Sequence, residues 1–192
     1  VQGELFGGRP ADLEACITGV GLQRRVRAAG AKAHGADAWL PKQLAGLPLE
    51  WFELLARIWR IVLRGGAFPK AWASVRVCLI PKHDGTSNRR PIGVASICWR
   101  AGMGVLVKAL TPWIQTWLDP DISSGPAREG TTTLEAMLGE LADAKDGGAA
   151  LFGGKIDLSK CFDRCHWERS LRILERFGLP PAFSNVVRAF YQ

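Results

Sequence analysis

One aspartate, Asp157, stands where a strand is expected to end and a helix to begin. Short apolar pieces at 149–152 and 156–158 surround Gly153 and Gly154, which predicts a buried strand with a bulge or a close approach. A carboxylate at the end of a strand is held rigidly and can still face solvent, as a hard divalent cation requires. The same position also suits an ordinary helix cap, so Asp157 alone leaves both interpretations open.

A second group of residues that could do chemistry lies in an expected basic β-hairpin. Residues 75–80 and 89–94 read as its two strands, and the turn formers of 81–88 join them. Lys82, Arg89 and Arg90 bracket this turn and could converge on one polyphosphate. A metal at the aspartate and cations that position a leaving pyrophosphate are what phosphoryl transfer requires. The alternative is an exposed sheet edge protected by Lys and Arg.

The elements that would position these residues are mostly helices. We expect helices over 11–29, 48–63, 96–118 and 182–191, the third with a bend or break near Pro112. Two more are expected, one from Thr132 or Thr133 to 144 and one that follows Asp163 and ends at 177. Helices, a basic hairpin, helices, a strand and further helices make an α+β pattern. Trp72 and Trp99 are expected in the core rather than on a surface that stacks bases.

The charge of the chain favours a polyanionic partner. The 192 residues carry a formal net charge of +7 and a pI of about 9.5. Between Leu55 and Lys108 there are ten Lys or Arg residues and one acid, Asp84. Arg24, Arg25 and Arg27 form another cluster, which could contact phosphate or be a solvated helix face. A merely soluble basic protein is the alternative that charge leaves open.

The cysteines indicate a reducing, intracellular setting. Five cysteines, an odd number, show no disulfide-like spacing. Cys161, Cys165 and His166 could be half of a zinc site, but no second pair completes it, so incidental thiols are favoured. The most apolar window, 92–110, contains Arg100 and Lys108 and is expected to be a core helix, with no membrane span.

Several segments, taken in order, resemble the fingers and early palm of a reverse transcriptase of the non-LTR retrotransposon and group II intron type. Residues 32–39 are similar to the family's loop of Lys, Gly and Asp, although Ala38 replaces the usual Gly after Asp37. Residues 69–82 resemble the family's first finger motif, and residues 89–92 resemble the second. Residues 124–132 resemble the element before the palm strand, with Gly-Pro-Ala-Arg where the family has Gly-Phe-Arg. Motif A resembles 156–163, and 174–191 fits the segment that follows.

The resemblance implies a role for each matching residue. Asp157, with the carbonyl of Leu158, would supply part of a site for two catalytic magnesium ions, and Phe162 would disfavour a ribose 2′-hydroxyl. Lys82 and Arg90 would contact the incoming deoxynucleoside triphosphate, with Arg89 as the adjacent competitor for the second role. Finally, Arg128 and Gly130 would lie beside the RNA template or DNA primer.

The resemblance also implies a division of the chain. Residues 1–34 would be a leader, 35–118 a fingers-like subdomain with the hairpin, and 119–192 the start of a truncated palm. The family needs a second aspartate motif, which does not occur before Gln192, so we expect a fragment without polymerase activity in isolation. Nuclear location is expected for a eukaryotic retrotransposon.

Two further interpretations remain open. One is a non-catalytic remnant that keeps a basic surface for RNA or DNA. The other is an RNA-directed RNA polymerase, against which the bulky Phe162 counts.

Overall fold

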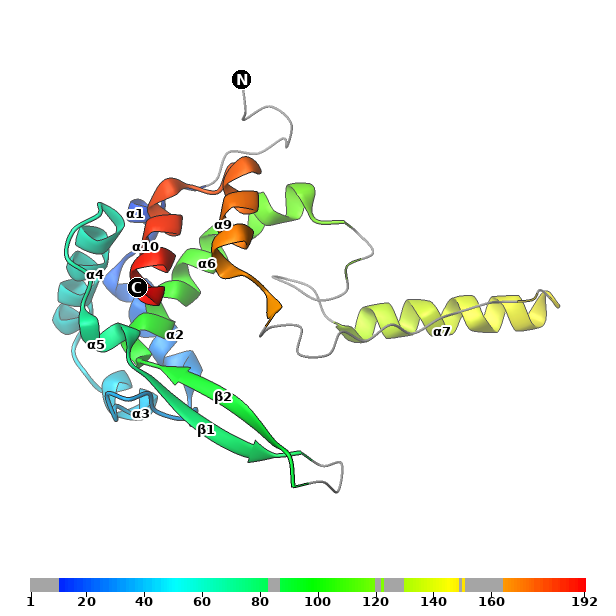
Figure 1. Cartoon of the computed structure of the whole chain (residues 1–192), viewed down its shortest axis with the longest axis horizontal. Coiled ribbons are helices and arrows are strands. Elements are labelled where there is room, and N and C mark those ends of the chain that lie inside the picture. Colours follow the sequence, from blue (N-terminus) through cyan, green and yellow to red (C-terminus); the bar gives the residue numbers. More distant parts are fainter. Residues whose placement is uncertain (1–10, 83–86, 120–121, 123–129, 149, 151–163) are drawn as a thin grey trace.

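The computed structural model describes residues 11–82, 87–119, 122, 130–148, 150 and 164–192 (Figure 1). In this part of the chain, one antiparallel hairpin extends from a group of packed helices. The helices are α1 (Leu13–Cys16), α2 (Gly19–Ala29), α3 (Pro41–Ala45), α4 (Leu49–Leu63), α5 (Lys70–Ala73), α6 (Ile97–Trp117), α7 (Gly130–Asp146), α9 (Trp167–Arg176) and α10 (Pro181–Tyr191). The strands are β1 (Val75–Pro81) and β2 (Arg89–Ala95). An α+β polymerase fold remains a prediction.

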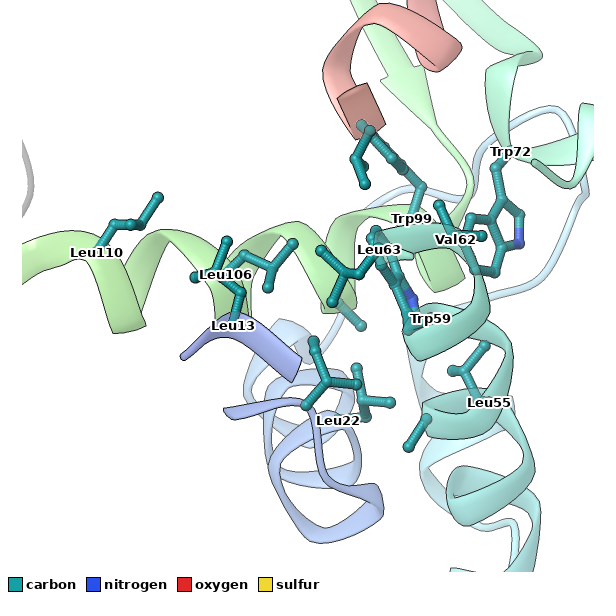
Figure 2. Packing of buried hydrophobic residues seen from close by; sticks show 14 of the residues in the cluster. Leu13, Leu22, Leu55, Trp59, Val62, Leu63, Trp72, Trp99, Leu106 and Leu110 are labelled. Carbon is teal, nitrogen blue, oxygen red and sulfur yellow. The ribbon is translucent and has the colours of Figure 1, made fainter. Parts of the chain in front are cut away.

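The core is built on the apolar face of α4. Phe52, Leu55, Trp59 and Val62 recur every three or four residues, and all four are buried. Helices α2 and α6 pack beside α4, and Figure 2 shows Leu22, Leu106 and Trp99 converging with Trp59. The tryptophan predictions are confirmed, because Trp72 is 7% and Trp99 8% exposed.

The aromatic side chains also anchor the end of the chain to this core. Trp59 stacks between Trp72 and Trp99, at centroid distances of 4.8 Å and 5.5 Å. Phe190 of α10 stacks on Trp99 at 4.4 Å with an interplanar angle of 9°. Buried residues from segments 1–34, 35–118 and 119–192 thus share one hydrophobic cluster, and the division into polymerase subdomains remains a prediction.

The expected single helix over 11–29 is wrong, because α1 and α2 are separate. Ile17 is fully buried between them, and its carbonyl accepts hydrogen bonds from Nε and Nη2 of Arg60, both at 3.3 Å. Thr18 then caps α2 by accepting from the Gly21 N–H at 3.1 Å. The break between α1 and α2 thus lies where Arg60 of α4 contacts the backbone of Ile17.

Other boundaries follow the expectations with some corrections. Strands β1 and β2, helix α4 and helix α10 lie where the pattern predicted them. Helix α6 runs through Pro112 without interruption, and α7 begins at Gly130, two or three residues early. The apolar window 92–110 is not one helix, because its first residues belong to β2. Helix α7 projects away from the other described helices (Figure 1).

Candidate nucleic-acid interface

The hairpin carries three of its cations near the end that points away from the helices (Figure 1). Lys82, Arg89 and Arg90 are all exposed, beside the connection between the strands. Within the described residues, none of these three side chains forms an ion pair with an acid. The hairpin also exposes large apolar side chains, among them Val77 and Leu79. The described hairpin therefore combines positive charge near its tip with apolar surface along its strands.

The register of the hairpin separates the two arginines. Ile80 pairs with Arg90 and Pro81 with Arg89, and the Lys82 N–H donates to the Asn88 carbonyl at 3.2 Å, which continues the ladder. Successive side chains of a strand point to opposite faces. Lys82 and Arg90 consequently share one face, as diagonal neighbours with Cα atoms roughly 7–8 Å apart. Arg89 lies on the other face.

Arg76 ties the face that carries Lys82 and Arg90 to the loop at 33–38. Arg76 and Lys82 are six positions apart along the strand, so their side chains point to the same face. The Nη1 atom of Arg76 lies 2.8 Å from Nε2 of His34. The other ring nitrogen of His34, Nδ1, lies 2.8 Å from the Gly35 carbonyl. A guanidinium only donates and a carbonyl only accepts, so the two bonds together require the neutral Nδ1–H tautomer.

Gly35 allows this loop to lie against the base of the hairpin. A Cβ at this position would come within 2.6 Å of the Ala95 carbonyl group and 2.8 Å of the Ser96 nitrogen. Only a glycine fits such a close approach of two backbones. The loop is thereby fixed at the junction where β2 passes into α6.

Arg100 of α6 also holds this loop. Its Nη2 donates to the Ala33 carbonyl at 2.7 Å. Burial lowers the pKa of Arg100 from its ordinary value, and the nearby charge of Asp37 acts in the opposite direction. Asp37 Oδ1, Arg76 Nε and Arg100 Nε are buried without a hydrogen-bond partner among the described residues. The junction therefore concentrates polar groups that are only partly paired.

Cys98 lies in the same junction and is held as a neutral thiol. Burial raises the pKa of Cys98 from 9.0 to about 11, and the negative charge of Asp37 is the second cause. Hydrogen bonds with the Ser96 side chain and the Cys98 backbone lower the pKa by less. A thiol with a raised pKa is a poor nucleophile at neutral pH. The structure thus gives Cys98 no reactive character.

Most of the remaining predicted site residues lie outside the described residues. These are Asp157, Leu158, Phe162 and Arg128. Gly130 is described only as the first residue of α7. Among the described residues, no group of three or more His, Cys, Asp or Glu side chains could hold a metal ion. The magnesium site therefore remains a prediction.

The sequence pattern missed three residues that organise this interface. His34, Arg76 and Arg100 connect the loop, the hairpin and α6. The resemblance included the loop at 32–39 and the strand within 69–82, but it gave no indication that the two contact each other. These contacts join residues up to 67 positions apart in the chain, so local spacing carries no signal for them.

Comparison with known proteins relates the chain to a retroelement. The chain is 26% identical over 145 residues to the retrovirus-related Pol polyprotein from type-1 retrotransposable element R2 of Nasonia vitripennis. The match covers 73% of this chain and 14% of that polyprotein, so the chain spans about one seventh of its relative. No family model matches the chain. The similarity indicates a retroelement-related protein.

None of the described helices has both the length and the apolar character that crossing a membrane needs.

Proposed function

We propose that this chain is part of an RNA-directed DNA polymerase of a retroelement, and that its hairpin contacts the phosphates of the incoming nucleotide. The observation that carries the proposal is the shared face of Lys82 and Arg90. A compact ammonium and a planar guanidinium on one face complement a triphosphate chain. Similarity to a retrotransposon Pol polyprotein supports the same conclusion.

The remaining roles follow from the matching motifs. Asp157 and the carbonyl of Leu158 would hold magnesium, which stabilises the charge that develops on the transferred phosphate. Phe162 would select deoxynucleotides by crowding a ribose 2′-hydroxyl. Arg128 and Gly130 would border the path of the RNA template and the DNA primer.

Of the two arginines, Arg90 is the better candidate for the triphosphate contact. It shares its face with Lys82 and with Arg76, whose side chain reaches the loop at 33–38. Arg89 points to the opposite face, with Leu79 and Val77. Arg89 would then contact a different part of the complex.

Primer extension on an RNA template tests the catalytic part of the proposal. The protein used is the whole reading frame that contains this chain, as wild type and as Asp157→Ala. We expect extension by the wild type and its loss in the variant, because motif A supplies one of the metal-binding carboxylates. Equal activity of the two proteins would remove Asp157 from the mechanism.

The second candidate function is a non-catalytic nucleic-acid-binding module, which the exposed basic hairpin favours. Its phosphate contacts come from Lys and Arg, so binding of RNA or DNA should weaken with salt and survive Asp157→Ala. If the whole frame binds nucleic acid in this way and never extends a primer, the module is the correct function.

A further inference from the structure

A basic hollow lies between α2 and the first turns of α6, away from the hairpin tip. Its volume is about 210 Å³. Three cations line it, namely Arg25, Lys32 and Arg100, and no acid is among its described lining residues. The other lining residues are small or apolar and leave room between the cations: Ala28, Ala29, Ile97, Ala101 and Gly104.

Arg25 is fixed in this hollow by the backbone of α6. Its Nη2 donates to the Gly104 carbonyl at 2.5 Å. A Cβ on residue 104 would come within 2.9 Å of Arg25 Nε, so the glycine is what lets the guanidinium lie against the helix. A guanidinium has five N–H donors, and this bond uses one of them. Arg25 is thus oriented in advance, which reduces the entropy lost when a ligand binds.

Arg100 is also oriented before any ligand arrives. Its bond to the Ala33 carbonyl holds the guanidinium, while its Nε is buried without a hydrogen-bond partner among the described residues. Burial lowers the pKa of Arg100, which indicates a partly desolvated cation. Such a cation is stabilised by an anion more than a fully hydrated one is.

We propose that this hollow binds a backbone phosphate of a nucleic acid through Arg25, Lys32 and Arg100. Three cations around a small concave site match one phosphate group, since Arg donates in a planar fork and Lys adds a point charge. The inference goes beyond the proposed function, because it concerns a surface separate from the nucleotide contacts of the hairpin.

The connection between the hollow and the hairpin favours a nucleic acid over a free phosphate ion. Arg100 holds Ala33, and the next residue, His34, accepts from Arg76 of β1. The two cationic surfaces are therefore parts of one fixed junction. A polymer with a phosphate at every nucleotide can contact both surfaces at once, whereas a single ion cannot.

The experiment measures binding of a fluorescently labelled single-stranded RNA to the 192-residue chain by anisotropy, over a range of salt concentrations. Arg25→Gln is compared with Arg24→Gln, which removes the same charge from an exposed neighbour on α2 that does not line the hollow. We expect Arg25→Gln to weaken binding roughly fivefold and to reduce the salt slope by about 1, and Arg24→Gln to do neither.

Gly104→Ala provides a second variant that keeps every charge. The new methyl group would displace the flexible guanidinium of Arg25 from the hollow. We therefore expect weaker RNA binding with unchanged net charge, while circular dichroism and urea unfolding report an intact fold. Lys32→Gln should weaken binding to a similar extent as Arg25→Gln.

Four outcomes would overturn the proposal. If Arg25→Gln and Arg24→Gln weakened RNA binding equally, the loss would come from net charge and not from a contact in the hollow. Unchanged RNA binding by a folded Gly104→Ala would remove Arg25 as a contact. Competition by inorganic phosphate at the hollow, with RNA affinity the same in wild type and Arg25→Gln, would assign the hollow to a free phosphate ion. Loss of binding only in Lys82→Gln or Arg90→Gln would leave the hairpin as the sole contact.

Discussion

Lys82 and Arg90 lie on the same face of the β1–β2 hairpin, as diagonal neighbours across the ladder. Arg90 pairs with Ile80, and the Lys82 N–H continues the ladder by donating to Asn88. Arg89 is adjacent in sequence, but the alternation of side chains directs it to the other face. Sequence neighbours in this hairpin are therefore separated in space, and residues eight positions apart are brought together.

The first prediction concerns these two arginines. We expect Arg90→Gln to weaken binding of a labelled deoxynucleoside triphosphate by about tenfold, because it removes a charged hydrogen bond on the face of Lys82. Arg89→Gln, with the same loss of charge, should change the affinity by less than about threefold. Titration of both variants at one salt concentration makes the comparison. A larger effect of Arg89→Gln would assign the triphosphate to the other face.

The second prediction concerns Ala38, which stands where the resembled family usually has Gly. Among the described non-glycine residues, Ala38 alone has a positive φ, of 59°. The left-handed region costs an L-residue roughly 1–2 kcal/mol, and a glycine avoids this cost while losing about 0.5–1 kcal/mol of chain entropy. We expect Ala38→Gly to leave the free energy of unfolding equal or higher by up to about 1 kcal/mol.

Urea unfolding checks this prediction, with Ala36→Gly as the control in the same loop. The control has no positive φ to relieve and should destabilise by about 0.5–1 kcal/mol. A destabilisation of the same size in both variants would contradict the assigned conformation of Ala38.

The third prediction concerns the contact between Gly102 and Trp59. A Cβ at 102 would overlap the indole ring of Trp59, which is fully buried and donates through Nε1 to the Cys98 carbonyl at 3.3 Å. We expect Gly102→Ala to destabilise by about 1–3 kcal/mol, although alanine favours a helix. A Cβ added at Gly139 in α7 would have no other atom within 4 Å, so Gly139→Ala should stabilise α7 by up to about 1 kcal/mol. Opposite signs in urea unfolding are the expected result.

The fourth prediction concerns the pH dependence of Cys98. Its pKa is raised to about 11 in the folded chain from 9.0, so between these values the folded state binds more protons than the unfolded state. The contribution to stability is present below pH 9 and is lost as pH rises toward 11, by roughly 2 kcal/mol. The free energy of unfolding of the wild type should fall across this window more than that of Cys98→Ala.

Alkylation provides a second measurement of the same thiol. Cys165 is exposed and should react with iodoacetamide at pH 8, whereas Cys98 should remain unmodified until the chain unfolds. Mass spectrometry of the digested protein identifies the modified cysteine. Rapid modification of Cys98 at pH 8 would contradict its largely buried position and raised pKa.

The fifth prediction concerns the anchor of α10. Phe190 stacks on Trp99 in the core, whereas Tyr191 is 57% exposed and stacks on Trp167. We expect Phe190→Ala to destabilise by about 2–3 kcal/mol and to increase hydrogen exchange in α10. Tyr191→Ala should cost under about 1 kcal/mol. Equal effects would mean that α10 is not held through Trp99.

The sequence predicted the elements whose signals are local. The strands of the hairpin and helix α4 followed from alternation and from the spacing of Phe52, Leu55 and Trp59. The sequence also predicted a basic region and the burial of Trp72 and Trp99. Charge and apolar periodicity are properties of short segments, so they can be read without knowing the fold.

Only the tertiary structure decided which residues meet. Arg60 contacts the Ile17 carbonyl at the break between α1 and α2. Arg76 and Arg100 hold the loop at 33–38, and Arg25 donates to the Gly104 carbonyl. Each of these contacts joins residues more than 40 positions apart. Hydrogen bonds and close backbone approaches of this kind arise when helices and strands pack, and no local pattern encodes them. The sequence by itself thus determined the charge and the elements with strong local patterns, such as α4 and the hairpin strands. Packing decided where α1 and α2 separate and where the cations converge.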